Sequence, residues 1–289
     1  MKKLFSSIVV AGLLVTSSFA TDTKTENVKH NAVLKAENKA EQSQELIKEA
    51  IRALKYTNDA YIYLNAKKKD KAIESLKKAI GELTVILNQP NAPYLLPVDI
   101  NIEASEYIGD INNISKQITN AKIALSKHQL PLARNILNTL KSEIDIKTVN
   151  LPLATYPDAI QLAIKYINEG KIKEAKDVIA MALNTLVTTD TIIPIPILKA
   201  NDLVIEASKI AKKDKKQTLK YLEEAKKQLK IAELLGYTSK SDTTYKMLKN
   251  SIENIESKIN HNKNTDSFFE DLKSKLKEFK EKAVSIISK

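Results

Sequence analysis

Residues Tyr166 to Ala175 read YINEGKIKEA, and this stretch decides whether the surrounding chain forms one long helix or two shorter ones. Apolar residues recur at helical spacing in this part of the chain. Gly170 interrupts the pattern, and glycine readily adopts the left-handed conformation that ends many helices. Two helices joined by so short a turn are antiparallel neighbours. The stretch therefore predicts a helical hairpin.

A second hairpin is predicted earlier in the chain, around the turn NAKKKD at residues 65–70. The apolar stripe before this turn consists of Leu46, Ala50, Ala53 or Leu54, Tyr61 and Leu64. The stripe after it consists of Ala72, Leu76, Ala79, Leu83 and Ile86. Five glycines and eight prolines in 289 residues also favour helices over the length of the chain.

The two hairpins align when the sequence is shifted by 103 positions. The shift pairs Tyr63 with Tyr166 and Pro93 with Pro196, and it pairs DINIEAS, residues 99–105, with DLVIEAS, residues 202–208. Shared helical composition alone rarely keeps a proline and a seven-residue pattern in register, so we interpret the chain as an internal duplication. Each copy is then a helix, a tight turn, a helix, an extended link and a third helix.

The links between the second and third helices are NQPNAPYLLPV and TTDTIIPIPIL, which we expect to be extended because proline disfavours helix at itself and at the preceding residue. These apolar links are expected to pack against helices or to be covered by another subunit. Further hairpins are predicted at residues 124–137 and 211–225, and a short strand around Ile144, Ile146 and Val149. The predicted fold class is all-α, with duplicated helical-hairpin units joined by proline-containing extended links.

The ends of the chain differ from this helical core, which is expected over residues 41–261. Lys2, Lys3, an apolar run and a small-residue site ending at Ala20 predict a signal peptide over residues 1–20, and hence a periplasmic protein. A membrane anchor is the alternative, although the run is shorter than the roughly 20 residues needed to span a bilayer. Residues 21–40 form a polar tail, disordered or loosely helical. A linker and an amphipathic helix are expected over residues 262–289, docked on the core or on a partner subunit, with at most peripheral membrane contact.

The chain is basic, with a formal net charge of +11, and 12 lysines lie between Lys209 and Lys249 against five acidic residues. A solvated helix face and a surface that binds anions both fit this pattern. Nucleic acid is not expected as a partner, because the segment has few arginines or aromatic residues with which to read or stack bases.

No catalytic, metal or cofactor site is predicted. The glycines are too widely spaced for a phosphate-binding loop, and the chain has no cysteine. His30, His128 and His261 are isolated, and His128 is expected to be exposed in a hairpin turn. An enzyme is therefore not expected.

Carboxylates are the most distinctive candidates. Asp99, Glu103, Glu106 and Asp110 would share one face of the expected third helix, and Asp202 and Glu206 repeat the first two. They either complement the positive end of the helix and then face water, or form a proton-sensing stripe whose mutual repulsion is relieved by acid.

Four tyrosines near the turns and links, Tyr61, Tyr63, Tyr156 and Tyr166, are expected to bury their rings and to hydrogen-bond the backbone of the links. The alternative is an aromatic-lined groove for a peptide or a small amphiphile.

The stretches LPVDINIEASEYIGDINN, LPLATYPDAIQLAIKYINEGKIKEA and ALNTLVTTDTIIPIPILKA resemble the YfdX family of bacterial exported proteins, over about residues 56–237. The resemblance implies an all-α, oligomer-forming periplasmic protein associated with acid and envelope stress and described as chaperone-like. The family offers no catalytic motif to transfer.

The expected function is that of a non-enzymatic stress protein that binds unfolded or acid-stressed envelope proteins as a homo-oligomer, with no cofactor. The alternative is an adaptor or binding protein for a specific partner or a small hydrophobic ligand.

Overall fold

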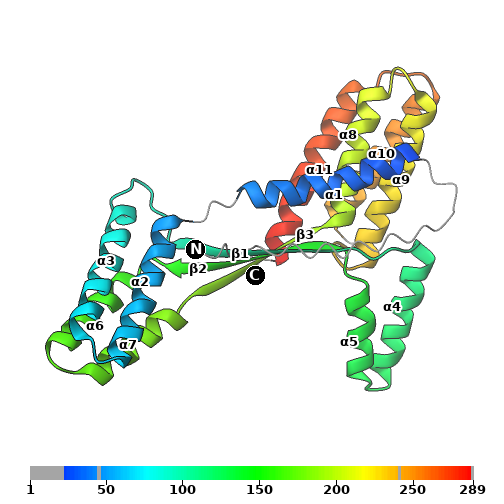
Figure 1. The fold of residues 1–289 in the computed structure, drawn as a ribbon. Coiled ribbons are helices and arrows are strands. Elements are labelled where there is room, and N and C mark those ends of the chain that lie inside the picture. The colour runs from blue at the N-terminus through cyan, green and yellow to red at the C-terminus, as the bar shows by residue number, and fades with distance from the viewer. Residues whose placement is uncertain (1–22, 44–46, 240–241, 288–289) are drawn as a thin grey trace. The chain divides into compact units, whose positions relative to one another are not determined.

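The computed structural model describes residues 23–43, 47–239 and 242–287, and Figure 1 shows their helices and strands. The first helices and strand are α1 (Thr23–Ser43), α2 (Lys48–Asn65), α3 (Lys69–Leu87) and β1 (Leu95–Ser105). The next are α4 (Ile111–Ser126), α5 (Leu130–Thr139), β2 (Glu143–Pro152), α6 (Tyr156–Asn168) and α7 (Ile172–Asn184). The last are β3 (Val187–Pro194), α8 (Ile195–Ile210), α9 (Lys215–Leu234), α10 (Thr243–Asn260) and α11 (Asp266–Ile287).

The structure is mostly helical but not all-α, because the described residues also form a three-stranded antiparallel sheet in the order β1-β2-β3. The alternating segment around Ile144 and Ile146 is the central strand, as predicted, and both side chains are buried. The expected all-α class is wrong in this respect. Its physical cause is that parts of the proline-containing links have alternating apolar residues and pair with β2 as strands, from Leu95 in the first link and up to Pro194 in the second. The end of the second link, residues 195–198, begins helix α8, so its expected extended conformation is wrong there.

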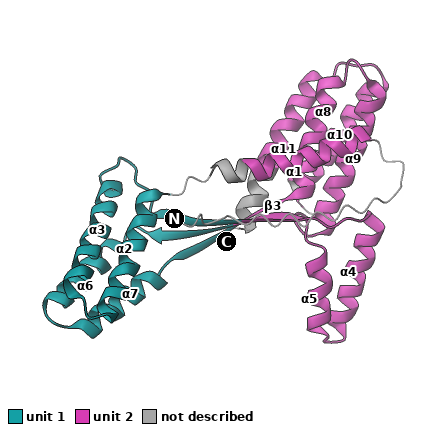
Figure 2. Ribbon diagram, viewed as in Figure 1, with its two compact units in different colours: residues 1–6, 42–101, 147–190 teal, residues 7–41, 102–146, 191–289 magenta. Residues whose placement is uncertain are grey.

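The chain divides into two compact units, which Figure 2 distinguishes by colour. Of the described residues, unit 1 contains 42–43, 47–101 and 147–190, and unit 2 contains 23–41, 102–146, 191–239 and 242–287. Each of the three strands contributes residues to both units.

The core of unit 1 is formed by α2, α3, α6 and α7. Every residue of the stripe predicted for α3 is buried: Ala72, Leu76, Ala79, Leu83 and Ile86. Small residues such as Ala53 and Ala163 are fully buried between the helices, where their short side chains allow close approach. Leu46, at the start of the other predicted stripe, lies outside the described residues.

The two hairpin turns of unit 1 share one backbone conformation. Gly170 has a φ of +77°, as its role in ending α6 predicts. Lys67, which the 103-residue shift places on Gly170, has a φ of +61° between α2 and α3. The helix ends at these turns are also 103 positions apart, Asn65 with Asn168 and Lys69 with Ile172, but α2 and α3 are longer than α6 and α7 at their other ends.

The third element of the copies does not correspond. DINIEAS lies in strand β1, whereas DLVIEAS lies in helix α8. In β1, Ile102 is buried while Asp99 and Glu103 are exposed, which is the alternation of a strand. In α8, Leu203, Val204 and Ala207 are all buried, which is the spacing of a helix face. The helix expected at residues 99–110 is therefore wrong.

The main core of unit 2 is formed by α8, α9, α10 and α11. Phe269, Leu272, Leu276 and Phe279 of α11 are buried in this core, so the C-terminal amphipathic stripe docks within the same chain. Helix α1, in the segment expected as a polar tail, packs Val28 against the same core. Helices α4 and α5 form a separate hairpin in this unit, with the turn predicted near His128.

The predicted signal peptide, residues 1–20, lies outside the described residues. Within the part of the chain that the structure describes, no helix combines the length and apolar character that crossing a membrane requires.

Candidate functional site

The six candidate acids lie on different kinds of elements, so the helical row expected from their spacing does not exist. Asp99 and Glu103 are in strand β1, Glu106 follows it, and Asp110 is the N-cap of α4. Asp202 and Glu206 are in α8. Their role in proton sensing remains a prediction, because it rests on titration rather than on their placement.

Four of these acids have specific partners inside unit 2. Asp110 accepts the backbone N–H of Asn113 over 2.7 Å, which caps α4. Asp202 forms an ion pair with Lys35 of α1 over 3.3 Å, and Glu206 forms one with Lys209 over 2.7 Å. Glu106 pairs with the largely buried Lys199 of α8. Two of these pairs, Lys35–Asp202 and Lys199–Glu106, join segments that are distant in the sequence.

A buried polar network that sequence reasoning missed centres on Glu143, at the start of β2, whose exposed fraction is 7%. Its Oε1 accepts a hydrogen bond from the Lys141 ammonium over 3.0 Å, and its Oε2 accepts one from the Tyr237 hydroxyl over 2.7 Å. The Tyr237 oxygen in turn accepts the Ser142 N–H over 3.1 Å. The Ser142 hydroxyl accepts the N–H of Tyr107 over 3.0 Å. The network thus joins the ends of β1, β2 and α9 within unit 2.

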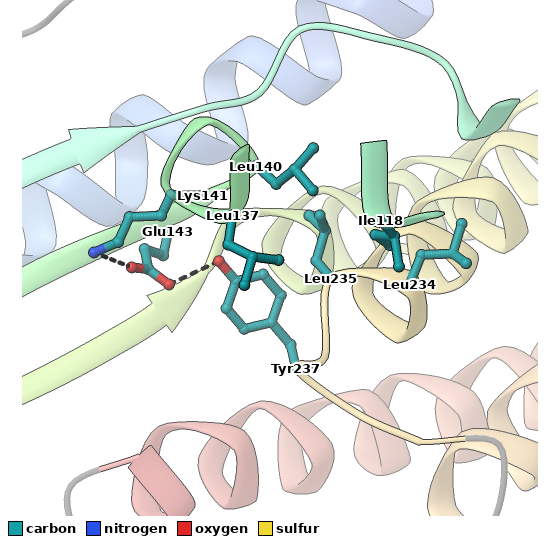
Figure 3. Close-up of a pocket in the computed structure, with 8 residues that line it drawn as sticks. All are labelled: Ile118, Leu137, Leu140, Lys141, Glu143, Leu234, Leu235 and Tyr237. Carbon is teal, nitrogen blue, oxygen red and sulfur yellow. Dashed lines mark hydrogen bonds and ion pairs between the residues drawn. The ribbon is translucent and has the colours of Figure 1, made fainter. Parts of the chain in front are cut away.

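This network forms one wall of a pocket of about 210 Å³ (Figure 3). Five aliphatic side chains line the rest of it: Ile118, Leu137, Leu140, Leu234 and Leu235. Figure 3 shows Lys141, Glu143 and the Tyr237 hydroxyl in a chain of polar contacts, beside the aliphatic lining. An apolar cavity with a polar group at one side is a general feature of sites for small amphiphilic molecules.

Burial and contacts with Glu143 shift the pKa values of two groups that line the pocket. It raises the pKa of the Tyr237 hydroxyl, and the hydrogen bond to the Glu143 carboxylate raises this pKa further. The hydrogen bond and the negative charge of Glu143 also raise the pKa of the Lys141 ammonium. Both carboxylate oxygens of Glu143 already have a partner, so the network as it stands holds segments together rather than presenting a free base.

The position of Tyr237 follows from the way α9 ends. Gly236 has a φ of +86°, and its N–H bonds the Glu233 carbonyl over 3.1 Å. The N–H of Tyr237 bonds the Ala232 carbonyl over 3.0 Å, which completes a Schellman motif. In that motif the residue after the glycine packs back on the helix, so the sequence GY at this end was a usable signal for a buried tyrosine.

The burial predicted for the rings of the four tyrosines near the turns and links is confirmed in full at Tyr156 and in part at the others, but the predicted hydrogen bond is missing at Tyr156. Tyr156 is buried, but its hydroxyl has no hydrogen bond of ordinary geometry to any described residue. Burial raises its pKa to about 12, and the nearby Thr57 hydroxyl opposes the shift. The rings of Tyr61, Tyr63 and Tyr166 are partly buried against the core of unit 1. Packing is therefore their observed role, without the predicted hydrogen bond at Tyr156.

Potential metal ligands do not converge. Among the described residues, no group of three or more histidine, cysteine, aspartate or glutamate side chains is arranged to hold a metal ion. His128 is exposed at the α4–α5 turn, as predicted, with a φ of +56°.

The fold and the site define a mostly helical, two-unit protein that carries a small antiparallel sheet and a polar network beside an aliphatic pocket. Residues 53–192 match the sequence model of the YfdX family, described as YfdX protein, so this part of the chain is a YfdX-family region. The resemblance is confirmed over these residues, and the match does not extend to residues 193–237 of the expected range.

A solved structure of Salmonella Typhi YfdX is also similar, with 15% sequence identity over 51% of this chain and 91% of that chain, at a TM-score of 0.36. A TM-score this low carries no structural detail to the present chain. No curated protein shows significant sequence similarity to it.

Proposed function

We propose that this protein is a non-enzymatic, exported stress protein that binds partly unfolded envelope proteins and acts as a homo-oligomer in the periplasm. The observation that carries the proposal is an uncharged segment of unit 1, residues 83–98, at the end of α3 and the start of β1. Four large apolar side chains are exposed there: Val85, Leu87, Tyr94 and Leu95.

The chemistry of this uncharged segment suits an unfolded polypeptide. Exposed apolar side chains gain free energy when they are covered by apolar groups of a partner. A segment without charges does not select for the charge of that partner, so it accommodates many sequences. It also lies within the YfdX-family region, residues 53–192.

Acid is proposed to strengthen client binding by loosening unit 2. Protonation of Asp202 and Glu106 removes their ion pairs with Lys35 and Lys199, which connect α1 and the segment after β1 to α8. It also adds net positive charge to a chain that is already basic, and self-repulsion then destabilises the compact state. Partly opened unit 2 exposes further apolar surface.

The test is suppression of client aggregation at pH 7 and pH 4 by the chain without residues 1–20. Val85→Gln with Leu87→Gln is expected to lower suppression several-fold at both pH values. Ile62→Gln with Leu162→Gln, which changes exposed apolar residues elsewhere in unit 1, is the matched control and is expected to retain it. Equal suppression by both double variants, or none by the unmodified chain, contradicts the proposal.

The pocket beside Glu143 favours a second function, in which the protein binds a small hydrophobic ligand. An aliphatic amine fits this chemistry, because its ammonium group can take the place of Lys141 on Glu143 while its tail contacts Leu234 and Leu235. Titration with hexylamine and with hexanoate, followed by NMR at Leu235 and Tyr237, tests this alternative. Saturable shifts with the amine alone support it, and no shifts with either compound exclude it.

A further inference from the structure

Helices α4 and α5 carry a surface that neither the proposed client binding nor the pocket uses. From Ile111 to Thr139 the chain contains Lys116, Lys122, Lys127 and Arg134, and it contains no aspartate or glutamate. The hairpins α2–α3 and α6–α7 differ, because each carries acids among its basic residues, such as Asp70 and Glu174. The α4–α5 hairpin is thus a cationic element by composition.

The four cations of this hairpin are exposed, and within the described residues none of them forms an ion pair. The lysine-rich segment 209–249 behaves differently. Its Lys212 pairs with Asp266 over 2.6 Å and its Lys226 with Glu256 over 2.9 Å, so part of its charge is neutralised inside unit 2. Positive charge on the α4–α5 hairpin is available to a partner.

Large aliphatic side chains accompany this charge at the tip of the hairpin, where α4 ends and α5 begins. Ile123 and Leu125 precede the turn, and Leu130 and Leu132 follow it, with exposed fractions between 45% and 61%. The inward faces are occupied by other residues, including the buried Ala121, Ala124 and Ala133. Packing between α4 and α5 therefore does not explain the exposed side chains.

Spacing places charge and apolar groups on common faces. Lys116, Ile123 and Lys127 recur at i, i+7 and i+11 along α4 and at its C-cap, and Leu130 and Arg134 are four residues apart on α5. Lys127, at the C-cap, also complements the negative end of α4. That role explains neither the absence of acids nor the exposed leucines.

We propose that the α4–α5 hairpin is a membrane-surface binding element, whose tip inserts its aliphatic side chains among the headgroups of an anionic phospholipid bilayer. Lysine and arginine beside exposed leucine and isoleucine are the composition of helices that lie in the membrane interface. Each basic residue near an anionic bilayer is worth about 1 kcal/mol, or roughly five-fold in affinity. An acidic protein would also match the positive charge of the hairpin. It lacks the apolar layer that a bilayer has beneath its anionic headgroups, into which the exposed side chains of the tip can insert.

The experiment is co-sedimentation of the chain without residues 1–20 with vesicles of phosphatidylcholine alone, and with vesicles of phosphatidylcholine and phosphatidylglycerol in equal parts. Binding is expected only to the vesicles that contain phosphatidylglycerol, and high salt is expected to weaken it. Lys116→Gln, Lys122→Gln and Lys127→Gln together are expected to weaken it roughly 100-fold. The matched control changes Lys67, Lys68 and Lys71, at the α2–α3 turn, to Gln and is expected to retain binding.

A second pair of variants tests the aliphatic tip. Leu125→Gln with Leu130→Gln is expected to weaken binding at least ten-fold, whereas Ile62→Gln with Met181→Gln is expected to leave it unchanged. Circular dichroism and sedimentation velocity establish that each variant is folded and report its mass. Equal losses in test and control variants overturn the proposal. So does loss of self-association without loss of vesicle binding, which would identify a second copy of the chain as the occupant of this surface.

Binding that depends only on residues 262–289 also overturns the proposal, because it would place membrane contact on α11. Because these measurements use lipid and no client protein, their failure leaves the proposed client binding intact, and the reverse also holds.

Discussion

Tyr237 donates its hydroxyl proton to Oε2 of Glu143 over 2.7 Å and, with the same oxygen, accepts the N–H of Ser142 over 3.1 Å. One phenol oxygen from the end of α9 thus satisfies a buried carboxylate and a buried backbone donor at the start of β2. Neither partner has an evident replacement for it, since Lys141 already bonds the other oxygen of Glu143.

Replacing Tyr237 with phenylalanine is expected to lower the free energy of unfolding by about 1–3 kcal/mol, because the carboxylate and the Ser142 N–H lose a partner while remaining buried. Chemical denaturation at pH 7 measures the change. Tyr94→Phe is the control, because Tyr94 is 84% exposed and its loss of a hydroxyl is expected to cost less than about 0.5 kcal/mol. Equal stability of the two variants would show that the network contributes little.

Glu224 and Lys29 provide a pH-dependent contribution to stability in unit 2, with their charged atoms 3.1 Å apart. Burial alone would raise the pKa of Glu224, but Lys29 and Gln228 offset this, so its folded pKa lies below its ordinary value. Burial alone would lower the pKa of Lys29, but Glu26 and Glu224 raise it above its ordinary value. The Glu224 carboxylate therefore stabilises the folded state at pH values above its unfolded pKa. The Lys29 ammonium stabilises it at pH values below its own unfolded pKa.

Glu224→Gln is expected to destabilise the protein by about 1–2 kcal/mol at pH 7, since a partly buried charge-assisted hydrogen bond is lost. The difference from the unmodified chain is expected to shrink as the pH falls through the folded pKa of Glu224, where that carboxyl is protonated. Urea denaturation at a series of pH values from 7 to 3 follows this difference. A difference that stays constant over the series would contradict the assignment, and the exposed Glu74→Gln is the control.

Substitutions at Gly170, Gly81 and Lys67 test the effect of backbone conformation on stability separately from that of packing. Gly170→Ala is expected to cost about 1 kcal/mol or more, because φ at this position is +77° and alanine is strained there. Gly81→Ala is expected to stabilise α3 by about 0.5–1 kcal/mol, because the added Cβ meets nothing within 4 Å in a helical backbone. Lys67→Gly, at the matching turn, is expected to be neutral or stabilising. Thermal melts should therefore show a lower melting temperature for Gly170→Ala than for the unmodified chain, a higher one for Gly81→Ala, and an equal or higher one for Lys67→Gly.

Leu76 is fully buried between the helices of unit 1. Leu76→Ala is expected to lower the free energy of unfolding by about 2–5 kcal/mol through lost burial and the cavity left behind. Leu87→Ala, at an exposed position of the same helix, is expected to cost less than about 1 kcal/mol. Calorimetry that finds equal costs for the two would contradict the position of the core.

Hairpins were predictable from the sequence because their signals are local. The turns at residues 65–70 and near Gly170 interrupt apolar stripes, and the stripe from Ala72 to Ile86 is buried without exception. The strand around Ile144 was predictable for the same reason, since its alternation is visible in ten residues.

The element formed by DINIEAS was not predicted, because similarity to DLVIEAS outweighed its own periodicity. Asn101 stands where the second copy has Val204. With asparagine, polar and apolar residues alternate, and the segment pairs with β2. With valine, the apolar residues gather on one helix face and enter the core of unit 2. A single residue type therefore changes the period of the pattern.

The Glu143 network could not be predicted from spacing, because Tyr237 is 94 positions from Glu143 and 95 from Ser142 and meets them only through the sheet and the end of α9. The helical acid row failed for the opposite reason. Its regular spacing has meaning only on a helix, and the backbone there is a strand followed by a cap.

Each unit is assembled from segments that are far apart in the sequence. Neither unit can therefore close until the last of its segments has left the ribosome. Unit 1 needs residues as far apart as 42 and 190, and α1 reaches Glu224, 195 positions away from Lys29, only after α9 exists. Such long-range closure is slow compared with the formation of a local helical hairpin. Nascent chains should therefore carry ready-made hairpins for some time before either unit closes, and in that interval they would need the same protection from aggregation that we propose the finished protein gives to others.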